Sequence, residues 1–249
     1  MFERRFAHYW EAGIQRLLQK NLSEKLWLEK IKRALEEQMR PKKDAEKGRL
    51  FVPNCYVTHV SALDAEGRDL DALRARLYVC LVQSAIRRDF FSHERLRLEL
   101  RPNPLLKKGA VRAQAAYGQK LYGSCGAAQE TDGGQTVVFD RKALPLAEVC
   151  EQGAVFASLF VRAGARAGLR VPLGERRVQI GRQEGSSLCV PDAGVSRLHA
   201  YISFEGCRHV LYDADSLNGT YVNGARISCR PLLPGDLIRA GGTEIAYEL

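Results

Sequence analysis

The most informative segment of this 249-residue sequence is Asp215-Ser216-Leu217-Asn218-Gly219-Thr220-Tyr221-Val222-Asn223-Gly224. Two shorter blocks precede it, Ile180-Gly181-Arg182 and Val195-Ser196-Arg197-Leu198-His199-Ala200, and Leu233-Pro234-Gly235-Asp236-Leu237-Ile238 follows it. Each block is expected in a loop or at a strand end, because short β-branched and aromatic runs flank it. Loops at one end of a β-sandwich commonly build binding sites.

The runs around these blocks predict short β-strands. They are residues 157–161, 169–173, 177–180, 200–204, 209–212, 220–222, 237–240 and 244–249. Many short strands separated by turn signals are typical of an all-β sandwich, which we expect over residues 154–249. Asn223-Gly224 has the composition of a two-residue hairpin turn.

In order and spacing, the four blocks resemble the forkhead-associated (FHA) domain, whose signature is Gly-Arg, Ser-x-x-His and Asn-Gly. The resemblance implies a domain that binds phosphothreonine in an extended peptide. Arg182 would supply a guanidinium fork and Ser196 a hydroxyl donor to the phosphate. Arg197 would add charge or hold the peptide backbone, and Asn218 would recognise the peptide main chain.

The resemblance also implies supporting roles for other residues. Gly181 and Gly219 would permit turns that a Cβ opposes, and the ring of His199 would hold the binding loops in place. Leu217 stands where many FHA domains carry threonine or another polar residue, so we expect apolar packing from it instead of a peptide contact. Each block alone has a plainer structural explanation, and their joint order favours a phosphate site.

The first 117 residues have a different pattern, which predicts an α+β domain. Helical spacing is expected over residues 2–20, as a leading helix, then over 24–39 before Pro41, and again over 70–88. We expect a charged loop at 42–48 and a strand over 50–60 that is bent at Pro53-Asn54. The alternating residues 95–100 predict a strand paired with 111–117.

The segment Arg49-Leu50-Phe51-Val52-Pro53-Asn54-Cys55-Tyr56-Val57, followed by an expected helix and β-hairpin, resembles the N-terminal domain of bacterial FhaA-type proteins. The resemblance implies a role in bacterial Ser/Thr kinase signalling, linked to cell-wall growth or division.

Residues 118–153 are predicted to be a linker. Its segment around Thr136 resembles the phosphoacceptor region of small bacterial FHA regulators, where the phosphorylated tail folds back on its own FHA domain. Thr136 is therefore a candidate phosphorylation site for self-inhibition. The alternative is that Thr136-Val137-Val138-Phe139 forms an edge strand or packs on either domain.

Charge and composition restrict the remaining function classes. The formal net charge is +9, and by residue count +8 of it lies in residues 1–150. That excess leaves open a basic N-terminal domain that binds nucleic acid or an acidic membrane, with the FHA domain as an interaction module. Seven scattered cysteines without a CxxC pair predict reduced thiols, and we expect no metal site and no cofactor. No apolar run of about 18 residues and no signal peptide is legible, so a cytoplasmic location is expected.

These observations favour a non-enzymatic adaptor. The five histidines stand in no metal or triad motif, and no P-loop, no GxGxxG opening a helix and no kinase catalytic loop is present. We expect as partners a threonine-phosphorylated protein, a Ser/Thr protein kinase and a second protein bound by the N-terminal domain. Nucleic acid and membrane surfaces are the less favoured partners.

Overall fold

The computed structural model describes residues 24–43, 48–118 and 153–249. The expected leading helix at 2–20, most of the linker and Thr136 lie outside the described residues. Within the described ranges, no helix has both the length and the apolar character needed to cross a membrane. The predicted fold class is confirmed: an α+β region precedes an all-β sandwich.

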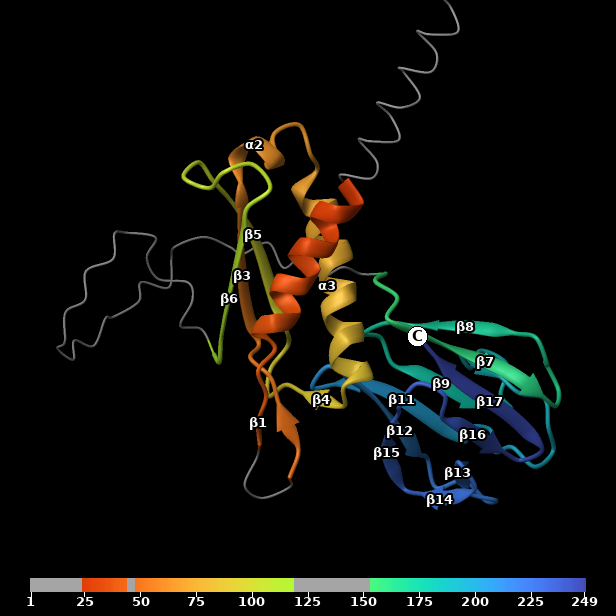
Figure 1. The fold of residues 1–249 in the computed structure, drawn as a ribbon. Helices are drawn as coiled ribbons and strands as arrows, with labels where there is room; N and C mark the ends of the chain where they lie inside the picture. The colour runs from red at the N-terminus through yellow and green to blue at the C-terminus, as the bar shows by residue number, and fades with distance from the viewer. Residues whose placement is uncertain (1–23, 44–47, 119–152) are drawn as a thin grey trace, which may run out of the picture.

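In the N-terminal domain, two helices cover one face of a three-stranded sheet (Figure 1). One helix occupies residues 24–38 of the described chain, and α3 spans Leu70–Arg87. The side chain of Asp69 caps α3 by accepting hydrogen bonds from the Asp71 and Ala72 N–H groups. The short α2, Ala62–Ala65, precedes α3 in the sequence. Both long helices bury apolar side chains at helical spacing, as predicted: Ile31, Leu35, Leu77, Leu81 and Ala85.

The pairing of this sheet differs from the expected hairpin. Its strands are β3 (Cys55–Ser61), β5 (Arg97–Asn103) and β6 (Val111–Ala116), in the order β5-β3-β6. The prediction that residues 95–100 pair with 111–117 is therefore wrong. Because α3 makes a crossover between β3 and β5, these two strands pair in parallel, and β6 pairs antiparallel with the other edge of β3.

A second small sheet corrects two local expectations. β1 (Lys42–Lys43) pairs with β2 (Leu50–Phe51), which pairs with β4 (Phe90–Phe91). The expected charged loop thus begins with a strand. The expected bent strand is two strands in different sheets, separated at Pro53 and Asn54 because proline lacks a backbone donor.

The C-terminal domain is a sandwich of two sheets. Among the described residues, one sheet has the order β10-β9-β11-β12-β15 and the other β14-β13-β16-β17-β7-β8. The strands are β7 (Ala157–Ala163), β8 (Arg170–Leu173), β9 (Val178–Gly181), β10 (Leu188–Cys189), β11 (Ala200–Glu205), β12 (Arg208–Asp213), β13 (Thr220–Val222), β14 (Ala225–Ile227), β15 (Cys229–Pro231), β16 (Leu237–Ala240) and β17 (Thr243–Glu248). The short β10, β14 and β15 were not predicted.

The hairpin turn at Asn223-Gly224 is also hydrogen-bonded to a neighbouring connection. Both residues have positive φ, 52° and 82°, as a two-residue turn of this kind requires. The Asn223 side chain donates to Asp236 Oδ1 at 2.7 Å and accepts from the Leu237 N–H at 2.9 Å. The turn is therefore fastened to the β15–β16 connection.

The two domains share one apolar cluster. It contains Trp27, Leu77 and Tyr78 from the N-terminal domain together with Phe156 and Tyr247 from the sandwich. The rings of Tyr78 and Phe156 meet edge to face, with centroids 6.0 Å apart. In Figure 1 the C-terminal end of α3 lies against the sandwich.

Polar contacts surround this shared cluster. Glu175 accepts a hydrogen bond from the Tyr78 hydroxyl at 3.0 Å and forms an ion pair with Arg95 at 2.6 Å. The Gln83 side chain donates to the Phe156 carbonyl at 3.0 Å, and the Ser92 N–H donates to the Gly206 carbonyl at 3.0 Å. Interface contacts therefore come from both side chains and backbone.

Arg208 is the most deeply buried charge in this interface. Its side chain is fully buried, and it donates to Asp89 Oδ1 at 2.6 Å, to the Ile86 carbonyl at 3.4 Å and to the Leu232 carbonyl at 2.8 Å. Burial lowers the pKa of the guanidinium, and the charge of Asp89 opposes that effect. The cation lies at the C-terminal end of α3, where the helix dipole favours positive charge.

Candidate functional site

Three loops of the sandwich meet at one groove. They follow β9, precede β11 and connect β12 to β13, and the groove is lined by Arg182, Gln183, Ala193, Gly194, Val195, Ser196, Arg197, Leu198, Leu217 and Asn218. The Arg182 N–H donates to the Ser196 carbonyl at 2.9 Å, and the Gln183 N–H donates to the Arg197 carbonyl at 3.2 Å. The structure thus brings together the four residues expected to bind the phosphopeptide.

Gly181 makes the close approach of two of these loops possible. A Cβ at this position would lie 2.1 Å from the Arg197 carbonyl oxygen, far inside van der Waals contact. Glycine is needed here for backbone proximity, and this places Arg182 beside the Ser196 loop. Gly219, in contrast, has a φ of +76°, a conformation that other residues rarely adopt.

Arg182 is exposed and oriented. Its Nε donates to the Val195 carbonyl at 3.2 Å, and its terminal nitrogens make no hydrogen bond within the described chain. A guanidinium held at Nε presents two parallel donors to an incoming oxyanion. Arg197 is also exposed and lines the same groove, so two cations face it while no carboxylate lines it.

Ser196 is held so that its hydroxyl can donate. The Leu217 N–H donates to Ser196 Oγ at 3.2 Å, which occupies one acceptor position and leaves the hydroxyl proton available. The Ser196 N–H in turn donates to Nδ1 of His199 at 3.1 Å. The hydroxyl is therefore held by the β12–β13 loop, and the Ser196 backbone is held by the ring of His199.

His199 supports the loops from beneath the groove. The residue is fully buried, its N–H donates to the Ile180 carbonyl at 2.9 Å, and its carbonyl accepts from the Ala214 N–H at 3.0 Å. Since Nδ1 accepts a backbone N–H, the neutral ring carries its proton on Nε2. Burial lowers the ring's pKa, although the nearby charge of Asp213 opposes this, and a neutral His199 fits the architectural role expected for it.

Asn218 and Leu217 form the opposite side of the groove. The Asn218 side chain donates to the Gly194 carbonyl at 2.8 Å, and its amide oxygen makes no hydrogen bond within the described residues. Leu217 is 88% exposed. The expectation that Leu217 packs against apolar neighbours is wrong, because its backbone N–H is used to hold Ser196 and its side chain projects outward.

Comparison with protein families covers both parts of the chain. Residues 178–241 match the FHA domain, and residues 1–114 match the N-terminal domain of FhaA. The chain is an FHA-domain protein with an FhaA-type N-terminal domain.

Individual relatives match only part of this chain. The FHA domain-containing protein FhaB of Mycolicibacterium smegmatis is 38% identical over 92 residues, which are 36% of this chain and 59% of the relative. FhaA of Mycobacterium tuberculosis is 41% identical over 70 residues, 28% of this chain and 13% of FhaA. The matched segment thus spans less than two thirds of either relative.

A solved FHA structure is also similar. The structure comes from a structural and functional analysis of phosphothreonine-dependent FHA domain interactions. It is 36% identical, covering 37% of this chain and 95% of that chain, with a TM-score of 0.35.

Two aspartates that the sequence did not single out shape the FHA groove. Asp192 accepts from the Gly194 and Gly242 N–H groups, both at 2.8 Å, and these bonds lower its pKa. It thereby ties the Ser196 loop to the β16–β17 turn. Asp213 accepts from the Ser216 and Thr220 hydroxyls at 2.5 and 2.6 Å. An aspartate followed within three residues by serine or glycine was the available signal.

The described residues contain no cluster of side chains that could bind a metal ion. Within residues 24–43, 48–118 and 153–249, no group of three histidine, cysteine or acidic side chains lies close enough together to hold an ion. What the FHA groove offers is two guanidinium groups, an oriented hydroxyl and an amide. This set suits an oxyanion attached to an extended chain.

Proposed function

We propose that this protein is a non-enzymatic adaptor whose FHA groove binds phosphothreonine in a partner protein. The observation that carries the proposal is the paired placement of Arg182 and Ser196, each fixed by a hydrogen bond that leaves its donors free. A phosphate monoester carries about −1.5 to −2 charge near pH 7 and three strong acceptor oxygens, which match these donors. The family of the domain and the mycobacterial relatives support the same conclusion.

Recognition of the peptide chain would come from the other side of the groove. The free amide oxygen of Asn218 suits a backbone N–H of the peptide, and Arg197 adds charge beside the phosphate. The extended backbone of the bound peptide would then lie between the Ser196 loop and the Asn218 loop. In this arrangement the phosphate supplies most of the affinity and the amide supplies orientation.

The setting that fits this adaptor is bacterial Ser/Thr kinase signalling in the cytoplasm, with a link to cell-wall growth or division. We further propose that phosphorylated Thr136 competes for the same groove and that the N-terminal domain binds a second protein. The support for the Thr136 proposal is the sequence around it, since that residue lies outside the described ranges.

The test is calorimetric binding of a degenerate phosphothreonine peptide library to the full chain, with the unphosphorylated library for comparison. Replacing Arg182 by alanine removes charge-assisted hydrogen bonds worth about 1.5–3 kcal/mol each, so affinity should fall by roughly 10- to 100-fold or more. Arg162, an exposed arginine on β7, is the matched control, and Arg162→Ala should bind normally. Equal affinity of wild type and Arg182→Ala would refute the site.

A further inference from the structure

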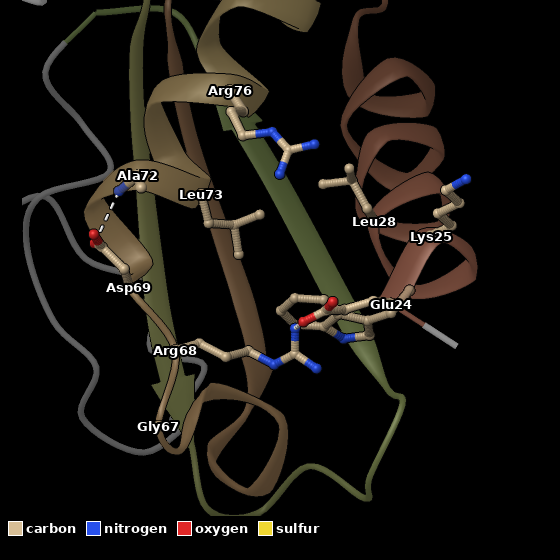
Figure 2. A pocket seen from close by; sticks show the side chains of 10 residues that line it. Glu24, Lys25, Leu28, Gly67, Arg68, Asp69, Ala72, Leu73 and Arg76 are labelled. Atoms are coloured by element: carbon tan, nitrogen blue, oxygen red, sulfur yellow. Dashed lines mark hydrogen bonds and ion pairs between the residues drawn. The ribbon is translucent and has the colours of Figure 1, made fainter. Parts of the chain in front are cut away.

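The N-terminal domain contains a cavity far in sequence from the FHA groove. Its volume is about 570 Å³, and it lies between the start of helix 24–38 and the start of α3. The lining residues are Glu24, Lys25, Trp27, Leu28, Gly67, Arg68, Asp69, Ala72, Leu73 and Arg76. Figure 2 shows Leu28 and Arg76 facing each other from the two helices, with Leu73 on the α3 side and Arg68 at one end.

Part of the cavity surface is apolar, and one polar atom in it has no partner. Leu28 and Leu73 are partly buried against the core, and Trp27 is only 8% exposed. The Nε1–H of Trp27 is buried and has no hydrogen-bond acceptor among the described residues. A buried indole N–H normally finds an acceptor, so this donor points to a group that residues 24–43, 48–118 and 153–249 do not supply.

Arg68 covers the indole. Its guanidinium lies 4.8 Å from the centroid of the Trp27 ring and forms an ion pair with Glu24. The side chains of Arg68 and Glu24 are 30% and 44% exposed, so this pair is accessible to a competing carboxylate. An acidic ligand that replaced Glu24 would move Arg68 and expose the indole N–H.

The other charges around the cavity favour a single acidic group. Arg76 is exposed and makes no ion pair within the described residues, and Lys25, on helix 24–38, is also exposed. Asp69 already accepts two backbone hydrogen bonds at the start of α3, whose dipole adds positive potential there. Because Glu24 and Asp69 also line the cavity, a polyanion such as nucleic acid would meet repulsion.

We infer that this cavity binds a partner-protein segment in which an acidic residue stands next to an apolar one. The apolar side chain would lie on Leu28 and Leu73, and the carboxylate would pair with Arg68 in place of Glu24, while Arg76, beyond Leu73, would add attractive charge. A backbone carbonyl or carboxylate oxygen of the segment would accept from Trp27 Nε1. This inference gives the second partner of the proposed adaptor a site and a chemistry, and it is independent of phosphate.

The experiment uses the full chain with Arg182→Ala, which disables the FHA groove, and Trp10→Phe, which leaves Trp27 as the sole tryptophan. A displayed library of random unphosphorylated octapeptides is selected on this protein. We expect enrichment of adjacent acidic and apolar residues, and binding of a selected peptide should change the Trp27 emission. Failure of the FHA proposal would not affect these readouts.

The decisive variant is Arg76→Glu, which should weaken binding of the selected peptide at least tenfold. Arg33→Glu, on helix 24–38, is the control, because Arg33 is 83% exposed and does not line the cavity. An unchanged Trp27 emission spectrum in the absence of peptide verifies that Arg76→Glu folds. The inference is overturned if no acidic-apolar motif is enriched, if Arg76→Glu binds normally, or if acidic vesicles or a DNA oligonucleotide produce a stronger response than the peptide.

Discussion

Asp89→Asn should destabilise both domains together, because it leaves the Arg208 guanidinium buried without its counter-ion. Asparagine tolerates the left-handed backbone of this position, where φ is 56°, so the change tests the charge alone. Removing one partner of a fully buried ion pair costs about 3–5 kcal/mol, and exposed pairs contribute about 0–1 kcal/mol. Arg208 is fully buried and Asp89 is 60% exposed, so we expect an intermediate loss of about 2 kcal/mol in the free energy of unfolding.

A double-mutant cycle separates this ion pair from general packing. Arg208→Met removes the buried charge, although it leaves the Ile86 and Leu232 carbonyls without their donor. Once that charge is gone, Asp89→Asn should cost little more, so the double variant should be more stable than the sum of the single losses predicts. We expect a coupling free energy of at least about 1 kcal/mol.

Urea unfolding, followed by Trp27 fluorescence and by far-ultraviolet circular dichroism, measures these values in proteins that all carry Trp10→Phe, including the wild-type reference. The shared apolar cluster predicts that the two signals report one transition. Glu37→Gln is the control, since its ion pair with Arg33 is exposed on both sides and should contribute under about 0.5 kcal/mol. Additive losses within about 0.5 kcal/mol, or separate transitions of the two domains in the wild type, would refute the reasoning.

Two further predictions concern protonation and phosphorylation. His209 is buried and hydrogen-bonded to the Tyr247 hydroxyl and the Gly174 carbonyl, and burial lowers its pKa to about 4. Because the unfolded ring has a pKa of about 6.5, its stabilisation is complete above pH 6.5 and up to about 3 kcal/mol is lost as the pH falls through 4; urea midpoints of His209→Gln should therefore fall less between pH 7.5 and 4.5 than those of wild type. Kinase treatment that places phosphate on Thr136, located by mass spectrometry, should weaken phosphothreonine-peptide binding in trans, and Thr136→Ala should abolish that effect. Undiminished peptide binding by protein phosphorylated at Thr136 would refute self-inhibition.

Much of the sandwich was predictable because its strands and turns are specified by residues that are neighbours in the sequence. Gly181 and the Asn223-Gly224 turn are dictated by backbone geometry at single positions, and the flanking strands have the β-branched composition of their class. The convergence of Arg182, Ser196 and Asn218 followed from the resemblance of their spacing to a known family. Leu217 was mispredicted because the use of its N–H by Ser196 depends on a loop 21 residues away.

Pairing and interfaces were not predictable, because they depend on distant partners. Strands at 97–103 and 111–116 look like a hairpin in sequence, and only the packing of α3 places β3 between them. Arg208, Glu175 and Asp89 look like surface charges, and their roles emerge when the two domains meet. The Trp27 Nε1–H, which has no acceptor within the described residues, was equally unpredictable, since burial without an acceptor is a property of the fold alone.

The interface between the two domains affects how partners with two binding motifs are selected. A flexible tether allows two sites to engage motifs at many separations, with an effective concentration that changes slowly with length. Here two contacts join the domains: the backbone hydrogen bond from Ser92 to Gly206 and the ion pair of the buried Arg208 with Asp89. They hold the FHA groove at a constant distance and angle from the N-terminal domain. With the two proposed sites, a bivalent partner would gain avidity only if its own motifs match that separation, so we expect discrimination among ligands by spacing as well as by sequence.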